Sequence, residues 1–331
     1  MTYAAFRSIG AYVPSNIMTN KDFENIIDTS DEWITKRTGI KTRYIASKDE
    51  SSSDLGTKAA LKAISRSKIV KEDIDMIICA TVTPDYLCMP STACIIGAKL
   101  GIKDVMAYDI SAACTGFVYA LSIAKSFIQS GVKKNVLIVG AEKYSSILNY
   151  EDRSTCFIFG DGAGAAIISA TNDKNEAILD VNCSSDGNYA DLIKVQGGGS
   201  KYPFSQEILD NKLSCIQMKG NETFKLAVKT LTSDVINMLT KYNLTTKDIK
   251  HFIPHQANLR IIKAVGDALN LDPSQTVITV DKYGNTSAAS IPMAMNDAYE
   301  QGKIKKGDNI LFDAFGAGLT WGSAFFPFCP N

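Results

Sequence analysis

Short apolar runs alternate with segments of helical periodicity along most of this chain. The runs MIICAT, VLIVGA, HFIPH and NILFDAF have the length and composition of buried strands. Between Cys114 and Ser130 the apolar positions recur at helical spacing, and Gly131 follows as a C-terminal stop. These positions are Phe117, Leu121, Ala124, Phe127 and Ile128. Strands that alternate with helices predict parallel strands in a layered α/β fold.

The pattern occurs twice. In the first copy it reads EDIDMIICATVTPD, VMAYDISAACTGFVYALSIAKSFIQSG and KKNVLIVGAEK, and in the second KDIKHFIPHQAN, VITVDKYGNTSAASIPMAMNDAYEQG and KKGDNILFDAFGAG. The matching landmarks, at offsets of 175, 172 and 174 residues, are Asp73 and Asp248, Asp109 and Asp281, and Asn135 and Asn309. A period this long indicates a duplicated domain rather than a solenoid. Two such halves that face each other predict a five-layered α-β-α-β-α sandwich.

We expect the halves to be residues 1–175, which carry the candidate nucleophile, and residues 176–331. Residues 184–216 are rich in glycine and serine and have no clear period. We therefore place a loop insertion there, shortly after the boundary between the halves.

Composition limits the classes of function. Hydrophobic residues make up 45% of the 331 residues, and 35 lysines and arginines balance 35 aspartates and glutamates. This balance argues against general binding to nucleic acid or to a membrane surface. The eight cysteines form no CxxC pair or zinc-site spacing, and the chain shows no secretory signal pattern or bilayer-length apolar stretch. We expect a cytoplasmic protein with reduced thiols and no metal.

Cys114 stands where a buried strand turns into a helix, in DISAACTGF. A helix N-terminus offers unpaired N–H groups and a partial positive charge, both of which favour a thiolate. A lone cysteine is more often a small buried hydrophobe. Cys114 differs from the other seven by this turn and by its duplicated counterpart, so we predict that it is a nucleophile.

The second copy supplies two partners. Its turn reads VDKYGNTSAAS and places Asn285 where the first copy has Cys114, while His255 follows the second copy's first strand in IPHQAN. Functional groups collect where parallel strands end, so halves packed about a two-fold axis bring the three side chains to one cleft. Taken alone, Asn285 reads as a turn residue and His255 as a core histidine. His251, four residues earlier, is interpreted as structural.

Two glycine-containing segments have different interpretations. The C-terminal FDAFGAGLTWGSAFF can direct backbone N–H groups at a carbonyl oxygen, although a tight turn with positive φ at Gly316 or Gly318 also accounts for it. The run at residues 160–165 has the GxGxxA form of a nucleotide-binding loop. Such a loop opens a helix, whereas AAIISA looks like a strand, so we reject phosphate binding there.

Four segments resemble β-ketoacyl-acyl-carrier-protein synthase III, the initiating condensing enzyme of type II fatty acid synthesis. They are DTSDEWITKRTGI (28–40), DISAACTGF (109–117), IPHQANLRII (253–262) and YGNTSAASIP (283–292), and the C-terminal GLTWGSA also fits. The resemblance covers nearly the whole chain. It implies a homodimer of thiolase-fold subunits that condenses an acyl-CoA primer, expected to be acetyl-CoA, with malonyl-acyl-carrier-protein. Coenzyme A thioester is then a substrate, and no cofactor is implied.

The resemblance also implies roles for single residues. Cys114 becomes the nucleophile, His255 and Asn285 the decarboxylation site, and the N–H groups of Cys114 and Ala317 the oxyanion hole. Trp33 and Arg153 are implied to sandwich the adenine of coenzyme A, with Arg37, Thr38 and Asn258 lining its tunnel. Without the resemblance, Trp33 is an ordinary partly buried helix tryptophan.

Lys225 and Arg260 match positions that meet the acidic carrier protein, and Lys229 and Lys263 lie one turn beyond each. Four basic residues at helical spacing form a local docking patch that a neutral overall charge does not exclude. The alternative is an ordinary solvated helix face.

Two residues depart from the family pattern. Ala317 replaces the middle of three glycines that the family often has, and an unusual φ there costs energy. Met89, in CMPSTAC, occupies a position at which the family commonly has phenylalanine. The resemblance implies that the residue at this position reaches across the dimer into the partner's acyl pocket. Methionine is flexible and tolerates a primer longer than acetyl.

Other functions stay open to different degrees. A thiolase needs a second reactive cysteine in the C-terminal glycine loop, which has none, and elongating condensing enzymes use two histidines where this chain offers His255 and Asn285. A related synthase that makes a quinolone, polyketide or hydroxymethylglutaryl product remains open. A non-catalytic dimeric binding protein of the same fold would usually have lost the nucleophile.

Overall fold

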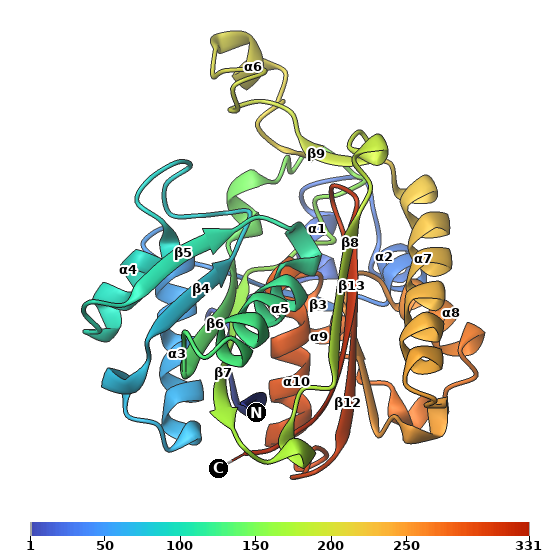
Figure 1. Cartoon of the computed structure of the whole chain (residues 1–331). Helices are drawn as coiled ribbons and strands as arrows, with labels where there is room; N and C mark the ends of the chain where they lie inside the picture. Colours follow the sequence, from blue (N-terminus) through green and yellow to red (C-terminus); the bar gives the residue numbers. More distant parts are fainter. Residues whose placement is uncertain (1, 331) are drawn as a thin grey trace.

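Two mixed β-sheets, each lying between layers of helices, form the computed structural model, which describes residues 2–330 (Figure 1). The first sheet has the order β1 (Tyr3–Tyr12), β7 (Gly162–Thr171), β6 (Asn135–Glu142), β4 (Met76–Ala80) and β5 (Met106–Ile110). The second has the order β8 (Asp180–Ser185), β13 (Thr320–Pro327), β12 (Asn309–Gly316) and β11 (His251–Pro254). The second sheet repeats the first four strands of the first, as a duplication requires.

Parallel pairing, which the alternation of strands and helices predicts, holds for β4 with β5 and β6 and for β11 with β12. The other strands are antiparallel. Only residues 317–319 separate β12 from β13, and so short a connection permits only a hairpin. The second copy's counterpart of β5 is reduced to one bridge between Phe252 and Thr276.

The helices form three layers around the sheets (Figure 1). The outer face of the first sheet is covered by α3 (Ser52–Ser67) and α4 (Thr92–Leu100), and that of the second by α7 (Gly220–Lys241) and α8 (Leu259–Ala268). Between the sheets lie α5 (Gly116–Gln129) and α10 (Ser290–Glu300). Buried apolar side chains fill each interface between layers. The predicted five-layered α-β-α-β-α sandwich is confirmed.

Matching hydrogen bonds show that the halves are copies. Asn135 Nδ2 donates to the carbonyl of Asp73 at 3.0 Å, and Asn309 Nδ2 donates to that of Asp248 at 3.1 Å. In each half the asparagine begins a central strand and the aspartate ends a one-turn 3-10 helix. The exact division of the chain at residues 175 and 176 stays a prediction.

A strained one-turn 3-10 helix precedes each central helix: η2 (Ala113–Thr115) before α5 and η8 (Ser287–Ala289) before α10. The first residue of each has a left-handed backbone, with φ 45° in η2 and 50° in η8. The repeat therefore aligns Cys114 with Ala288. The prediction that Asn285 takes the cysteine's own place is wrong by three residues, because the left-handed residues align Ala113 with Ser287.

Smaller elements complete the chain. β2 (Asn16–Thr19) pairs with β3 (Thr42–Ile45), and the short helices are α1 (Asn20–Glu24), α2 (Asp31–Thr38) and α9 (Val280–Tyr283). Further 3-10 turns are η1 (Lys71–Asp73), η3 (Tyr144–Ile147), η4 (Lys174–Glu176), η5 (Gly187–Tyr189), η6 (Thr246–Asp248) and η7 (Pro273–Gln275).

The predicted loop insertion contains regular structure. β9 (Ile193–Val195) pairs with β10 (Ile216–Met218), and α6 (Gln206–Asp210) stands on an arm that projects from the molecule (Figure 1). Elements of three to five residues are too short to show a period in the sequence.

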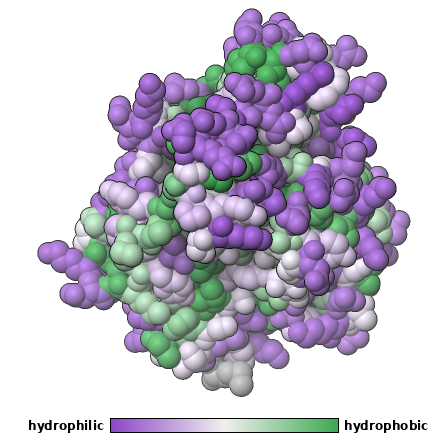
Figure 2. Space-filling model, turned by 90° about the horizontal axis from the view of Figure 1, so that it is seen from above, coloured by the Kyte–Doolittle hydropathy of each residue, from purple (hydrophilic) through white to green (hydrophobic). Residues whose placement is uncertain are grey.

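The glycine run at residues 160–165 continues as strand β7, which begins at Gly162, so the predicted strand is confirmed and no helix follows the run as a dinucleotide-binding loop requires. Among residues 2–330, no helix has both the length and the apolar character needed to cross a bilayer. Seen from above, the surface is mostly hydrophilic, with separate hydrophobic patches (Figure 2).

Candidate active site

A pocket of about 760 Å³ is lined by residues from both halves of the chain. Of the residues predicted to form the site, it brings together Trp33, Arg37, Thr38, Cys114, Lys225, His255, Asn258, Arg260, Asn285 and Ala317. Arg153, Met89, Lys229 and Lys263 do not line it. The candidate nucleophile thus shares one pocket with the candidate histidine and asparagine, as the duplicated halves predict.

The turn that carries Cys114 is pressed against the second sheet. A Cβ on Gly316 would lie 2.8 Å from the Cys114 nitrogen, so only glycine permits this approach. Thr320 Oγ1 donates to the carbonyl of Ala112 at 3.1 Å. The sulfur is therefore held in a fixed place, and Cys114 is only 9% exposed.

Burial controls the ionisation of Cys114. It raises the pKa of the thiol to about 12, while the Ser287 hydroxyl and the cysteine's own N–H act in the opposite direction. The thiolate that the helix N-terminus was expected to favour is therefore not the resting form, because desolvation outweighs the partial charge of the helix end. Attack by the sulfur requires that a base take its proton.

His255 is buried and neutral. Its backbone N–H donates to the carbonyl of Asp313 at 2.8 Å, which fixes it at the end of β11. Burial lowers the pKa of its imidazole to about 3. Nδ1 lies 2.6 Å from Ser290 Oγ, which already accepts the Gln256 N–H at 3.3 Å. The donor and acceptor roles in the contact with Ser290 depend on the tautomer of His255. In the tautomer in which the Ser290 hydroxyl donates to Nδ1, the neutral imidazole carries its proton on Nε2 and offers it as a donor.

Asn285 also presents a donor. Its backbone pairs with the segment before β7: the N–H donates to Ile158 O at 2.9 Å, and the carbonyl accepts from Gly160 N at 3.0 Å. Its side-chain Oδ1 accepts the Ser287 N–H at 2.8 Å. The carbonyl end of the amide is thus occupied, and its NH₂ group is available to a bound oxygen. His255 and Asn285 both line the pocket that contains Cys114, and in this tautomer of His255 each offers it a neutral donor.

The C-terminal loop adds a backbone donor. Neither the N–H of Cys114 nor that of Ala317 donates to another residue of the described chain, and both residues line the pocket. Ala317 has an ordinary negative φ, whereas Gly318 takes the left-handed value of 143°. Alanine in place of glycine at 317 therefore causes no backbone strain.

Trp33 lies at one side of the pocket between two guanidinium groups. Arg37 Cζ and Arg153 Cζ are each 4.4 Å from the centre of its ring, and Phe157 contacts it edge-on at 5.4 Å between ring centroids. Arg153 is half-exposed, and its nearest acid, Asp28, is 3.9 Å away. Arg153 therefore touches Trp33 directly, and an adenine ring between the two requires that this half-exposed arginine move outward.

The four predicted docking residues are exposed on two packed helices. Lys225 and Lys229 lie on α7, Arg260 and Lys263 lie on α8, and only the first of each pair reaches the pocket. Asn258 caps α8, where its Oδ1 accepts the Arg260 N–H at 2.8 Å and its Nδ2 donates to Arg37 O at 3.2 Å. Thr38 is buried, and its hydroxyl donates to Ile34 O.

Met89 does not line the pocket and lies in the connection between β4 and α4. Its side chain is 79% exposed, and its neighbours Tyr86 and Leu87 are also exposed.

His251 contacts Asp308, with 3.0 Å between Nε2 and Oδ2, and does not line the pocket, which confirms its structural interpretation.

The sequence missed several residues that surround the candidate groups. They are Glu142, Tyr144, Ser287 and Ser290, and the apolar wall residues Phe157 and Phe224. Ser290 could have been suspected, because it is the last polar residue of GNTSAAS. The others carry no periodic or motif signal, since their place depends on how the two halves meet.

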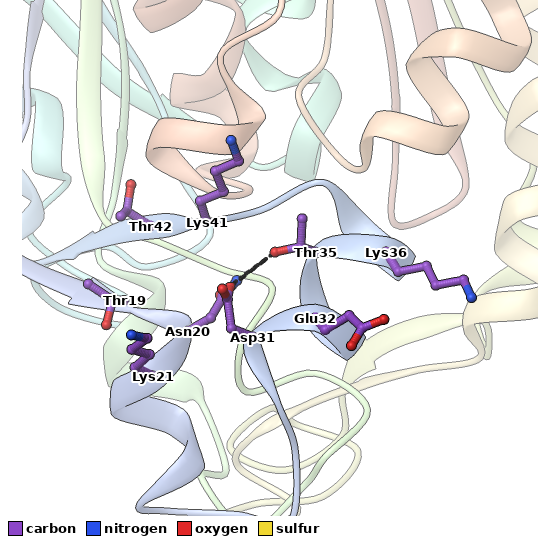
Figure 3. Close-up of a pocket in the computed structure, with 9 residues that line it drawn as sticks. All are labelled: Thr19, Asn20, Lys21, Asp31, Glu32, Thr35, Lys36, Lys41 and Thr42. Carbon is purple, nitrogen blue, oxygen red and sulfur yellow. Dashed lines mark hydrogen bonds between the residues drawn. The ribbon is translucent and has the colours of Figure 1, made fainter.

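A second hollow, of about 690 Å³, lies between α1, α2 and β3 (Figure 3). It is lined by Thr19, Asn20, Lys21, Asp31, Glu32, Thr35, Lys36, Lys41 and Thr42. Asn20 Nδ2 already donates to Asp31 Oδ1 and Thr35 Oγ1. The amino groups of its three lysines point in different directions. The hollow holds no nucleophilic cysteine or histidine, so it is not the candidate active site.

Comparisons with known proteins point to one family. The family model described as 3-oxoacyl-[acyl-carrier-protein] synthase III matches residues 108–187, and that of its C-terminal part matches residues 239–328. Beta-ketoacyl-[acyl-carrier-protein] synthase III of Aliarcobacter butzleri is 76% identical over 100% of this chain and 99% of its own length. The enzyme of the same name from Sulfurimonas denitrificans is 65% identical over 100% of this chain and 99% of its own length.

Solved structures show the same relation. The crystal structure of 3-oxoacyl-[acyl-carrier-protein] synthase III from Aquifex aeolicus matches with a TM-score of 0.91 at 45% identity, over 98% of this chain and 99% of that chain. Sequence, fold and the content of the pocket lead to one conclusion. This chain belongs to the β-ketoacyl-acyl-carrier-protein synthase III family.

Proposed function

We propose that this protein condenses an acyl-CoA primer with malonyl-acyl-carrier-protein, with loss of CO₂, to give β-ketoacyl-acyl-carrier-protein. The observation that carries this proposal is the pocket shared by Cys114, His255 and Asn285 in a chain of this family. Acetyl-CoA is the expected primer. The chemistry needs only thioesters, a nucleophile and hydrogen-bond donors, so we propose no metal or organic cofactor.

In the first half-reaction, the Cys114 sulfur attacks the carbonyl carbon of the acyl-CoA. The N–H groups of Cys114 and Ala317 support the oxyanion of the tetrahedral intermediate, since neither is occupied by another residue of the described chain. Coenzyme A leaves, and the acyl group stays on the sulfur.

In the second half-reaction, malonyl-acyl-carrier-protein enters the same pocket and loses CO₂. The Nε2–H of His255 and the NH₂ of Asn285 donate to the thioester oxygen as it becomes an enolate oxygen. Neutral donors suit this role because a carboxylate would repel the developing negative charge. The enolate carbon then attacks the acyl-Cys114 carbon, and the sulfur leaves.

The partners are proposed from the rest of the pocket and from the residues around it. Trp33, Arg37 and Arg153 form the proposed site of the coenzyme A nucleotide, with Thr38 and Asn258 beside it. The four exposed basic residues of α7 and α8 are proposed to meet the acidic carrier protein, with Lys225 and Arg260 at the pocket itself.

We propose a cytoplasmic homodimer. The exposed apolar side chains of Tyr86, Leu87 and Met89 support an interface at the connection between β4 and α4. Met89 would then reach the partner's acyl pocket, as the family pattern implies. A related synthase with another product would use the same nucleophile, and a non-catalytic relative would leave it unmodified.

The test is covalent loading of the enzyme. Purified protein incubated with labelled acetyl-CoA should carry one acetyl group on the Cys114 peptide, and addition of malonyl-acyl-carrier-protein should convert it to acetoacetyl-acyl-carrier-protein. An unmodified Cys114 would refute the proposed function. Acetylation of Cys114 without formation of acetoacetyl-acyl-carrier-protein would favour a synthase that makes another product. A panel of acyl-CoA primers then defines the acyl chain length that the enzyme accepts.

The neutral state of His255 predicts an unusual pH profile. Because burial lowers the pKa of its imidazole to about 3, the uncharged form persists as the pH falls through the usual histidine range. We expect the rate of malonyl-acyl-carrier-protein decarboxylation to show no inflection near pH 6.5. A loss of rate with a midpoint between about 6 and 7 that is absent in His255→Ala would contradict this expectation.

Trp33→Ala should weaken binding of the primer. Loss of the aromatic face removes stacking on adenine, which is worth roughly 1–3 kcal/mol, so KM for acetyl-CoA should rise by about 5- to 150-fold. KM for malonyl-acyl-carrier-protein, which has no adenine, should not change. Trp33→Phe keeps an aromatic face and serves as the matched control. Equal effects on both substrates would mean that Trp33 only supports the pocket wall.

A further inference from the structure

A buried carboxyl group behind Cys114 has no role in the steps above. Glu142 is the last residue of β6 and is completely buried. Its Oε2 accepts hydrogen bonds from Thr83 Oγ1 at 2.7 Å, Val82 N at 3.1 Å and Thr81 Oγ1 at 3.2 Å. Its Oε1 is buried without a hydrogen-bond partner in the described chain. No lysine, arginine or histidine of the described chain pairs with it.

The Ser287 hydroxyl lies near both this carboxyl group and the nucleophile, because η8, which carries Ser287, packs against β6, which ends at Glu142, and against η2, which carries Cys114. It is within interaction range of Cys114, Glu142 and Tyr144, and it lowers the pKa of each. Its Oγ is buried and makes no hydrogen bond of good geometry in the described chain. The left-handed backbone of Ser287 and the bond from its N–H to Asn285 hold it in this place. An acceptor and a hydroxyl, both unpartnered and both buried, therefore stand beside a thiol that must lose a proton.

We propose that Glu142 takes the proton of Cys114 through the hydroxyl of Ser287 during primer loading and returns it during condensation. This inference rests on the proposed function. As the sulfur forms its bond to the acyl carbon, the thiol proton moves to Ser287 Oγ, and the hydroxyl proton moves to Glu142 Oε1. The bond from the acyl carbon to coenzyme A breaks, and the coenzyme thiolate takes a proton from solvent.

Condensation reverses the transfer. The enolate carbon forms a C–C bond to the acyl carbon, the bond to the Cys114 sulfur breaks, and the thiolate regains the proton from Glu142 through Ser287. The resting enzyme is restored, and each turnover consumes one proton, which ends on coenzyme A. Decarboxylation itself does not use the relay.

The surroundings of Glu142 suit an acceptor that gains and loses a proton. The titratable groups that face it are Cys114, Tyr144 and Cys79 on β4, and burial raises the pKa of each, so all three are neutral at pH 7. Burial also raises the pKa of Glu142, to about 7, although the hydrogen bonds that its carboxyl group accepts lower this pKa. A carboxyl group poised near neutrality is matched to general-base work.

Glu142→Gln separates a relay from a simple effect of charge. The negative charge of Glu142 raises the pKa of Cys114, so removal of charge alone should make the sulfur more reactive. Loss of the proton acceptor should instead slow acetylation of Cys114 by roughly 10²–10⁴-fold, measured by quenched-flow mass spectrometry. Decarboxylation of malonyl-acyl-carrier-protein should stay within about twofold, as expected for a step that does not need a proton acceptor. An unchanged or faster acetylation would overturn the relay.

The pH profile and two further variants complete the test. Since the base must be ionised, wild-type acetylation should rise with pH through about 7, and this inflection should vanish in Glu142→Gln. Ser287→Ala should slow acetylation in the same way, and Glu142→Asp should restore part of it. Normal acetylation in Ser287→Ala would overturn the relay even if Glu142→Gln failed to fold. Wild-type protein that accepts no acetyl group would instead refute the proposed function.

Discussion

Cys114→Ser is expected to lose primer loading almost completely. A serine hydroxyl is much less acidic and less nucleophilic than a thiol, and the site already raises the pKa of the cysteine thiol to about 12. We expect the rate of acetylation to fall by about 10³-fold or more. Serine fits the space of the cysteine, so the turn against Gly316 should be preserved. The measurement is the mass of the peptide that contains residue 114 after incubation with acetyl-CoA.

The other cysteines provide the controls. Cys329 is buried but does not line the pocket. Cys329→Ser makes the same chemical change outside the site, so this variant should still be acetylated on Cys114 at the normal rate. Cys88 and Cys94 are exposed and report any non-specific acetylation. Cys114→Ser should melt near the wild-type temperature and should still decarboxylate malonyl-acyl-carrier-protein, because that step uses His255 and Asn285. Acetyl groups found on another cysteine at the wild-type rate would remove Cys114 from the mechanism.

The sequence predicts the features that depend on periodicity and repetition. The helical spacing after Cys114 corresponds to η2 and α5, and the landmark asparagines form matched hydrogen bonds in the two halves. AAIISA is a strand, as its apolar run indicates. These features are local or occur twice, so one chain is enough to reveal them.

Features that depend on contact between the halves were not predictable in the same way. Ser290 orients His255 from α10, and Ser287 reaches Cys114 from η8, yet neither residue stands at a position that a pattern marks. The ionisation state of the Cys114 thiol was also not predictable from the sequence. A helix end favours a thiolate, but the depth of burial, which reverses the balance, is known only from the packed structure.

The repeat also explains why the pocket lies between the halves. β6 packs on η8 in the way that β12 packs on η2, so each turn is held by the opposite sheet. Such contacts need small residues: a Cβ on Gly140 would lie 2.5 Å from Ala288 O, as one on Gly316 would crowd Cys114. The reacting groups come to one point because each half positions the turn of the other.

Asn285→Asp should largely abolish decarboxylation while primer loading continues. The Asn285 Oδ1 accepts the Ser287 N–H, and an aspartate keeps that bond but replaces the NH₂ donor with a negatively charged oxygen. Loss of one donor to a developing oxyanion costs roughly 10²–10³ in rate, and the new charge adds repulsion. The rate of CO₂ release from malonyl-acyl-carrier-protein measures this effect, and acetylation of Cys114 should fall by less than about tenfold.

The pH dependence of Asn285→Asp distinguishes this role from a structural one. A buried aspartate resists ionisation, and its protonated form can donate, so CO₂ release by the variant should recover as the pH falls. Asn296→Asp is the matched control, because Asn296 is equally buried, bonds to Arg66 and does not line the pocket. It should decarboxylate at nearly the wild-type rate. If both variants lost the same activity, or if Asn285→Asp kept full decarboxylation, the amide of Asn285 would not be the donor to the enolate.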